Sequence, residues 1–286
     1  MRRPRFGLVV VLIVLTAAAA NAGVGSVISS FPMSGNNEPY AVAVYRDANF
    51  VYGVLQYGPT GEHEHKLFTY APNGSVLGSI PLSCTPGWAN CRLDWLHDAD
   101  HSVLGDGYFG IIGVGKSFPP FGLDFNIKTG SIVGSFPTSP YARAYAHIPG
   151  GAYIYVGQSY PSNIFRLTTS GSVVSSFNPR DVCDLLAATD YFKGLNGAYL
   201  VSYGGGSGLY HHVYTDAGSL VGSFWLGHFS MAFAGVCGPG YPSSYGITYW
   251  CISWGSGGGV WCFQIDLGNA TAVAPASVGK IKALFR

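Results

Sequence analysis

A pattern of apolar and polar positions recurs along most of the chain. The heptapeptide GSVISSF at residues 25–31 begins with glycine and carries apolar residues at its third, fourth and seventh positions. Short apolar runs that leave a glycine turn are typical of β-strands. Similar heptapeptides follow at residues 74–80, 130–136, 171–177 and 218–224, and a degenerate sixth copy starts near Gly268.

Three more strand-like runs precede each later copy. The run directly before the glycine turn alternates or nearly alternates, the run before it is aromatic, and the first run is small and apolar. The copies are spaced 41 to 56 residues apart, and four strands in a unit of this length are typical of a propeller blade. The alternating runs are residues 66–70, 122–126, 163–167, 211–214 and 260–265, and the aromatic runs are residues 50–52, 108–112, 153–156, 199–201 and 245–249.

The strand count predicts the number of blades. The chain resembles the broad class of secreted non-WD β-propeller repeat proteins, and the resemblance implies an architecture but no activity. We expect an all-β propeller of five four-stranded blades, with the N-terminal strand at 25–31 closing the ring. A six-bladed ring would need a blade that the chain does not contain. One outer strand is then surplus, and it either packs on the side or pairs with another molecule.

The first 22 residues have the features of a secretory signal. Arg2, Arg3 and Arg5 precede an apolar run at 8–15, and small residues follow up to Ala22. We therefore expect a signal peptide at 1–22, the propeller at 23–267 and a C-terminal strand or tail at 268–286. No later apolar stretch is long enough to span a bilayer, so a secreted product at the cell surface or outside the cell is predicted.

Composition narrows the choice of partners. Of the 286 residues 48% are hydrophobic and only 10% are charged, which excludes an intrinsically disordered chain. The formal net charge of +1 gives no basic surface for nucleic acid, so nucleic acid is not an expected partner. No cofactor motif is present, and none is predicted.

Six cysteines in a secreted chain predict disulfides. Cys84 and Cys91 are close enough in sequence to staple one loop, and Cys251 and Cys262 would face each other across a hairpin at 253–260. Cys183 and Cys237 would then form the remaining pair, although other connectivities stay open. Zinc is the alternative, but no C-x-x-C spacing supports it.

Several motifs resemble binding sites. Asp98 and Asp100 are weak candidates for a metal, and the alternative is that they are ordinary residues of the turn between the first two strands of a blade. The segment 110–117 matches a phosphate loop, but two prolines follow where that loop requires a helix. Two histidine-rich segments, 62–65 and 211–212, lack a third fixed ligand, and we expect one imidazole of the second segment to point outward.

Catalytic residues are not assigned. Asp94, Asp184 and Arg143 lie in or just before inner strands and could face a central channel, but no matching glutamate completes a pair of catalytic carboxyls. Asn73 and Asn269 lie in sequons at hairpin turns, where they could carry glycan.

The sequence favours a non-catalytic secreted protein that works by contact, as a structural or interaction subunit. The surplus strand and the tail at 277–286 suggest self-assembly into filaments. Carbohydrate or small-ligand binding is the alternative, and a carbohydrate-active enzyme with channel acids is less favoured. The candidate binding aromatics, most of which we expect to fill gaps between blades, are Trp88, Trp95, Trp225, Trp250, Trp254 and Trp261.

Overall fold

The computed structural model describes a repeated all-β architecture, in which the described residues form strands, turns and short connections. The ranges described are 27–32, 38–45, 51–57, 65–71, 73–81, 93–105, 107–115, 121–139, 141–181, 183, 185–203, 210–225, 232–239, 247–253 and 259–266.

Five four-stranded antiparallel sheets are formed by these residues, and we number the sheets in chain order. The first contains β2 (Glu38–Tyr45), β3 (Val51–Tyr57), β4 (His65–Tyr70) and β5 (Val76–Pro81). The second contains β6 (Leu93–His101), β7 (Tyr108–Gly115), β8 (Phe121–Asn126) and β9 (Ile132–Pro137). The third contains β10 (Ala142–His147), β11 (Tyr153–Gln158), β12 (Asn163–Thr168) and β13 (Val173–Phe177).

The fourth sheet contains β14 (Leu185–Phe192), β15 (Leu195–Tyr203), β16 (Tyr210–Thr215) and β17 (Leu220–Trp225). The fifth contains β18 (Ala232–Pro239), β19 (Ile247–Ser253), β20 (Gly259–Asp266) and, as its outer strand, β1 (Val27–Pro32). The N-terminal heptapeptide thus pairs with the last strand described, with Phe31 opposite Val260. This pairing is the one that the strand count predicts.

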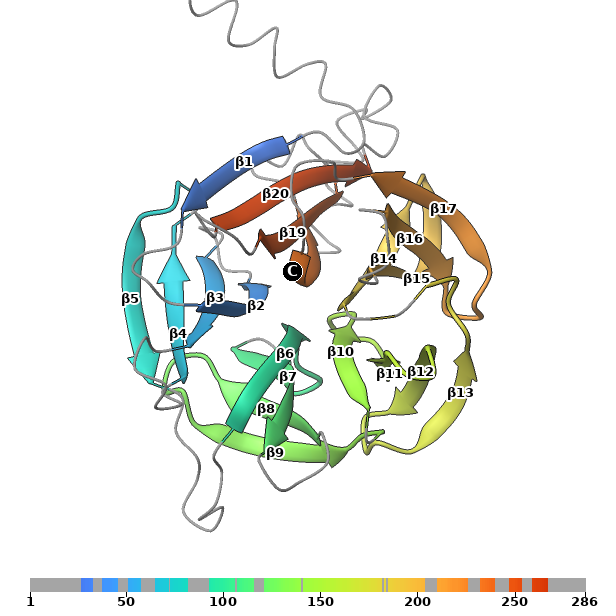
Figure 1. The fold of residues 1–286 in the computed structure, drawn as a ribbon, viewed down its shortest axis with the longest axis horizontal. Helices are drawn as coiled ribbons and strands as arrows, with labels where there is room; N and C mark the ends of the chain where they lie inside the picture. Colours follow the sequence, from blue (N-terminus) through green and yellow to red (C-terminus); the bar gives the residue numbers. More distant parts are fainter. Residues whose placement is uncertain are drawn as a thin grey trace, which may run out of the picture.

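The sheets are arranged around a common centre, each with its first strand innermost and its heptapeptide strand outermost (Figure 1). The innermost strands contact one another: β2 lies against β6, β6 against β10, β10 against β14, β14 against β18, and β18 against β2. Four sheets are antiparallel meanders of consecutive strands, and the fifth is a three-stranded meander completed by β1. This topology and the close contact between neighbouring sheets are consistent with propeller blades.

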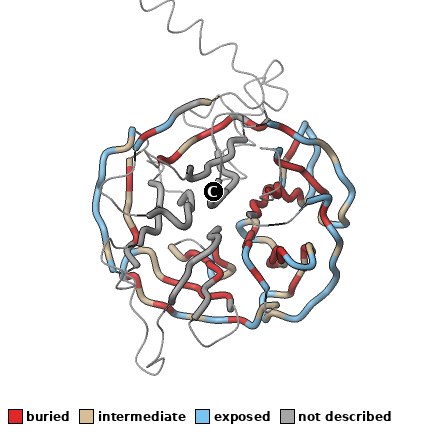
Figure 2. The backbone as a smooth tube through the Cα atoms, viewed as in Figure 1, coloured by how far each residue is buried: buried red, intermediate tan, exposed pale blue. Residues whose placement is uncertain are grey.

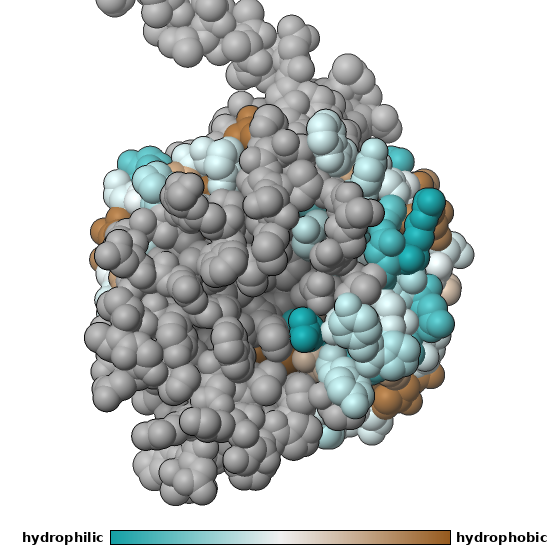
Figure 3. All heavy atoms as spheres, viewed as in Figure 1, coloured by the Kyte–Doolittle hydropathy of each residue, from teal (hydrophilic) through white to brown (hydrophobic). Residues whose placement is uncertain are grey.

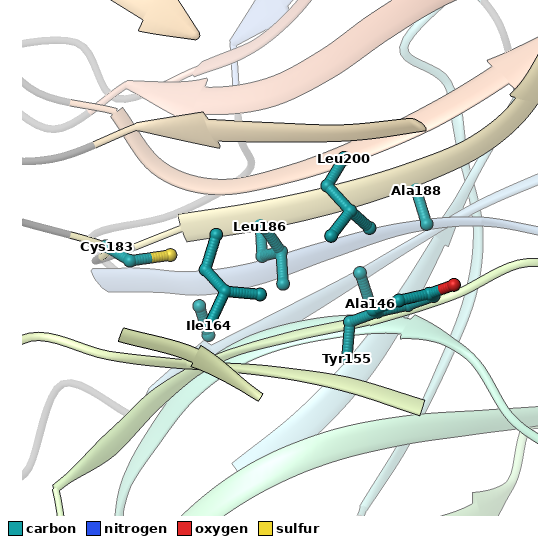
Figure 4. Packing of buried hydrophobic residues seen from close by; sticks show 8 residues of the cluster. Ala146, Tyr155, Ile164, Cys183, Leu186, Ala188 and Leu200 are labelled. Atoms are coloured by element: carbon teal, nitrogen blue, oxygen red, sulfur yellow. The ribbon is translucent and has the colours of Figure 1, made fainter. Parts of the chain in front are cut away.

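The core lies between neighbouring sheets. One buried cluster joins the third and fourth sheets and includes Tyr155, Ile164, Leu186 and Leu200 (Figure 4). A second cluster joins the second and third sheets around Tyr145, which is fully buried. In these clusters small residues occupy the inner strands, and aromatic residues lie between neighbouring sheets. The buried alanines are Ala142, Ala144, Ala146, Ala187 and Ala188.

The outermost strands expose part of their apolar sequence (Figures 2 and 3). Most residues of β5, β9, β13 and β17 are exposed or half-buried. The hydrophobic residues that are most exposed on these strands are Val76, Leu77, Val133, Val173, Val174, Leu220 and Trp225. The glycine that opens each internal heptapeptide adopts a positive φ, as the turn prediction requires: Gly74, Gly130, Gly171 and Gly218 have φ of 84°, 69°, 86° and 87°.

Two sequence predictions are wrong. Asp98 and Asp100 lie within β6 rather than in a turn, because a bulge between Leu96 and Ala99 lets the strand continue to His101. Cys251 lies opposite Trp261, so it is one position out of register with Cys262. Adjacent positions of a strand alternate between the two faces, and the two cysteine positions therefore fall on opposite faces of the fifth sheet.

Among the described residues no helix is both long and apolar enough to cross a membrane. The segments predicted as signal peptide (1–22) and as surplus strand and tail (268–286) lie outside the described residues.

The second and third sheets pack so closely at Gly110 that the methyl group of an alanine there tests the contact between them. A Cβ at Gly110 would lie 2.2 Å from the Tyr145 hydroxyl oxygen, whereas a Cβ at Gly78 would have no atom within 4 Å. Overpacking of a core typically lowers stability by about 1–3 kcal/mol. We therefore expect Gly110→Ala to lower the free energy of unfolding by about that amount in urea titrations. The matched variant Gly78→Ala should leave it unchanged, and equal stability of both variants would contradict the packing described.

Candidate functional site

The outer hairpin of the fourth sheet combines polar and aromatic side chains on one face. Tyr210 of β16 lies opposite Trp225 of β17, and His212 lies opposite Ser223. Because side chains two residues apart share a face of a strand, these four residues form one group. We call this group the β16–β17 face.

A chain of hydrogen bonds runs across the β16–β17 face. His212 Nδ1 lies 2.6 Å from Ser223 Oγ, and His212 Nε2 lies 2.7 Å from Asp181 Oδ2. The imidazole is buried, with 7% of its side chain exposed, while half of the Asp181 side chain is exposed. A hydroxyl, an imidazole and a carboxylate are thus joined in series, with the hydroxyl and the carboxylate toward solvent.

The carboxylate determines the tautomer of the neutral imidazole. An ionised carboxylate can only accept hydrogen bonds, so Nε2 carries the proton and donates it to Asp181. Nδ1 is then the acceptor, and the Ser223 hydroxyl donates to it. This is the arrangement in which an imidazole can take a proton from a serine hydroxyl.

The connection that supplies Asp181 is held at two points. Ser162 Oγ, from the turn between β11 and β12, donates to the Asp181 carbonyl at 2.6 Å. The Arg180 backbone N–H donates to the Tyr214 hydroxyl at 2.8 Å. Burial raises the pKa of Tyr214, and this hydrogen bond from the Arg180 amide partly offsets the effect. The site is therefore built from the third sheet, the fourth sheet and the connection between them.

An exposed aromatic pair adjoins the hydrogen-bond chain. Tyr210 and Trp225 are 54% and 59% exposed, although aromatic side chains of this size are usually well buried. Trp225 therefore does not fill a gap between neighbouring sheets, which is where we expected most of the tryptophans to lie. Tyr210 is two residues from His212, and Trp225 is two residues from Ser223. Each separation is about 7 Å along the strand.

Both histidines of the 211–212 pair are buried, so the expectation that one imidazole points outward is wrong. His211 stacks between Tyr203 and Phe224, at centroid distances of 4.9 and 5.1 Å. His212 occupies the other face of β16, where the connection at 178–181 covers it. The sequence shows two neighbouring histidines but not this covering segment, which belongs to the connection between β13 and β14.

The repeat itself contains the signal that sequence reasoning missed. In each sheet one residue lies opposite the sixth position of the heptapeptide, which is always serine. That residue is apolar in four sheets, namely Phe68, Leu123, Phe165 and Trp261, and it is His212 only in the fourth. The residue after the heptapeptide also differs, since Pro32, Pro81, Pro137 and Asn178 stand where the fourth sheet has Trp225.

The other candidate residues are not brought together with this site. Asp94 and Arg143 lie in the innermost strands β6 and β10, each at a register shift, and Arg143 is exposed. Asp184 lies outside the described residues. Within the described ranges no group of three or more His, Cys, Asp or Glu side chains could hold a metal ion. The side chains of Asp98 and Asp100 lie outside what the structure describes, so their metal binding stays a prediction.

The remaining sequence motifs have ordinary places in the fold. Asn73 is exposed in the turn between β4 and β5, where its Oδ1 accepts a hydrogen bond from the Ser75 amide. Cys183 and Cys262 are buried. Residues 110–115 of the phosphate-loop match lie in β7, and His65 begins β4. Outside the described residues lie Asn269, Cys84, Cys91 and 62–64.

A second buried polar pair lies in the second sheet. Asp124 is 5% exposed, and its Oδ1 accepts a hydrogen bond of 2.6 Å from Ser102 Oγ. Ser102 Oγ also accepts from the Leu104 amide, so the pair organises the turn after β6. Burial raises the pKa of Asp124, and the Ser102 hydrogen bond only partly offsets this effect. We assign this pair a structural role.

Comparisons with known proteins identify no family for this chain. No family model and no curated protein matches it. Among solved structures it is similar to a protein of unknown function from Bacteroides caccae, with 14% identity, a TM-score of 0.44, and coverage of 79% of this chain and 74% of that one. A nidogen/laminin complex gives 12% identity, a TM-score of 0.49, and coverage of 76% and 73%. Hydrazine synthase from Kuenenia stuttgartiensis gives 12% identity and a TM-score of 0.44, with coverage of 75% of this chain and 56% of that one.

The buried carboxyl of Asp124 should make stability depend on pH. Its pKa in the folded protein is above the ordinary value of 3.8, so the folded state binds the proton more tightly than the unfolded state. Its contribution to stability is therefore full below pH 3.8 and is lost as the pH rises through the folded pKa. Asp124→Asn keeps an acceptor for Ser102 but does not titrate. We expect the Tm of the variant relative to that of the native protein to be higher at pH 7 than at pH 3.5, and a difference independent of pH would contradict this.

Proposed function

We propose that this protein is a secreted propeller that acts by contact with an extracellular partner. In this proposal the five sheets are the blades, and β1 closes the ring by completing the fifth sheet. Support for the ring comes from the contacts between successive innermost strands and from the pairing of β1 with β20. Support for secretion comes from the signal-like pattern of residues 1–22.

The contact surface is the β16–β17 face, and the observation that carries this assignment is the exposed pair of Tyr210 and Trp225. Tryptophan and tyrosine are the residues most enriched among the strong contacts of binding interfaces. The equivalent cross-strand pairs are Lys66 with Pro81 in the first sheet and Phe121 with Pro137 in the second. The aromatic pair therefore belongs to one sheet and is not a requirement of the repeat.

A carbohydrate is the partner that fits this surface. The faces of the two rings offer apolar area to the C–H groups of a sugar, and the exposed carboxylate of Asp181 offers an acceptor for sugar hydroxyls. A few polar groups beside aromatic side chains are the usual composition of a site for a small polar ligand.

We expect Trp225→Ala to weaken glycan binding by about tenfold or more without changing Tm, because the lost side chain is exposed in the folded protein. The measurement is a glycan microarray followed by calorimetric titration of the sugars that bind. Val133 lies on the outer strand of the second sheet and is 50% exposed, close to the 59% of Trp225. Val133→Ala is therefore the matched control and should bind glycan as the native protein does. Failure of the native protein to bind any glycan, or full binding by Trp225→Ala, would overturn the carbohydrate assignment.

Self-assembly is a second candidate, and one observation of the fifth sheet favours it. In the other sheets the heptapeptide that follows the third strand becomes the outer strand, but beside β20 that place is taken by β1. The place beside β20 is therefore not available to the sixth copy of the heptapeptide, which starts near Gly268 in the sequence. This copy can pair with the exposed edge of a second molecule.

Removal of residues 268–286 tests this second candidate. We expect the native protein to form filaments in negative-stain electron microscopy and the truncated protein to be monomeric, because a heterologous contact that does not close forms open assemblies. Monomers in both samples would retire self-assembly, and filaments in both would assign it to a different surface.

A further inference from the structure

The His212 imidazole occupies a position that the repeat does not require to be polar. The other four sheets form the same strand pairing with an apolar residue opposite the serine. A buried imidazole needs hydrogen-bond partners to offset its loss of water. His212 has two such partners, and one of them comes from a connection outside the sheet. Polar departures of this kind from an otherwise consistent repeat concentrate at functional positions.

The three groups differ in exposure in the way that nucleophilic catalysis requires. Ser223 lies on the solvent-exposed surface of the outermost strand, so an electrophile can reach its hydroxyl. His212 lies behind it and is shielded from water. The neutral imidazole presents a lone pair to the hydroxyl proton, because Asp181 holds the other nitrogen in its protonated form.

We propose that Ser223 is a nucleophilic serine that His212 activates as general base, with short-chain carboxylic esters as the substrate class. The exposed rings of Tyr210 and Trp225 lie on the same face and supply apolar area for the alcohol portion of such an ester. In this site Nδ1 of the imidazole faces the nucleophile and Nε2 faces the carboxylate. A group of serine, histidine and aspartate is recognised by the role of each residue, so either ring nitrogen can face the serine.

The first half of the reaction forms an acyl-serine. Ser223 Oγ attacks the carbonyl carbon while its proton passes to His212 Nδ1. The bond from carbon to the alcohol oxygen then breaks, and the leaving alkoxide takes the proton from Nδ1, so a neutral alcohol departs.

In the second half a water molecule releases the acid. The water gives a proton to Nδ1 and attacks the acyl carbon, the bond from carbon to Oγ breaks, and Oγ recovers the proton. The products are one carboxylic acid and one alcohol for each ester and water, with no change of oxidation state. Asp181 is a positioning residue, since its carboxylate contacts the imidazole and not the reacting atoms.

A fluorophosphonate is the direct test, since it captures an activated serine in a single step. Oγ forms a bond to phosphorus, the P–F bond breaks, fluoride leaves, and the hydroxyl proton passes to His212. We expect the purified protein to gain one phosphonyl group, which peptide mass spectrometry locates on Ser223. It should also hydrolyse p-nitrophenyl acetate faster than free imidazole at equal concentration.

The repeat supplies matched variants. Ser223→Ala should abolish labelling, and His212→Phe, which installs the residue found at this position in the first and third sheets, should slow labelling by roughly 100-fold or more. Asp181→Asn should also slow labelling at unchanged Tm. Ser176→Ala changes the equivalent serine of the third sheet, which lies opposite Phe165, and should be labelled as the native protein is.

The outcomes separate this inference from the proposed binding function, on which it does not depend. A native protein that gains a phosphonyl group on Ser223 but binds no glycan would overturn the carbohydrate assignment and leave the nucleophile intact. A native protein that binds glycan but gains no phosphonyl group would overturn the nucleophile and leave the binding function intact. Labelling that persists in His212→Phe, with Tm unchanged, would also overturn it.

Discussion

Aromatic and alanine side chains fill the space between neighbouring sheets, and the other features of the molecule depend on this packing. An isolated four-stranded sheet of this composition would leave apolar residues on both faces in water. Stacking sheets around a centre covers both faces of each one, but only if the inner strands carry small residues. Ala144 and Gly157 show how little space remains, because a Cβ at Gly157 would lie 2.4 Å from Cys183 Sγ.

The same packing leaves the outermost strands comparatively unconstrained. Most of their residues are exposed or half-buried, so changes at those positions leave the contacts between sheets intact. Trp225 and Ser223 lie on such a strand, while His212 lies one strand further in, where burial makes a polar group depend on its partners. On the β16–β17 face the exposed residues Ser223 and Trp225 can therefore vary without loss of packing, while the buried His212 is held in place by its hydrogen bonds. Binding and chemistry at this face are compatible, because the aromatic pair and the hydrogen-bond chain use different side chains.

The boundary between the third and fourth sheets is reinforced by polar as well as apolar contacts. Arg166 of β12 reaches Asp216, in the turn after β16, at 2.9 Å and lies 4.6 Å from the centre of the Tyr153 ring. Burial, with a smaller contribution from Asp216, raises the pKa of the neighbouring Tyr155 to about 12. The rings of Phe177 and Tyr214 pack in a tilted arrangement, with their centroids 5.5 Å apart. A site assembled from both sheets is thus held in a fixed relative position, which is what a hydrogen-bond chain across the boundary requires.

The sequence by itself determined the repeat, the four strands of each unit and the use of glycine at the turns, because each depends on periodicity and on local backbone preference. It also predicted the pairing of the N-terminal heptapeptide with the last strand, since strand counting needs no coordinates. Only the tertiary structure decided that β6 runs through Asp98 and Asp100, that Cys251 and Cys262 occupy opposite faces, and that both histidines are buried. Asp181, His212 and Ser223 are separated by 31 and 11 residues along the chain, and two of them belong to different strands. Their meeting depends on how a connection crosses between two sheets, and no local pattern of residues encodes that crossing.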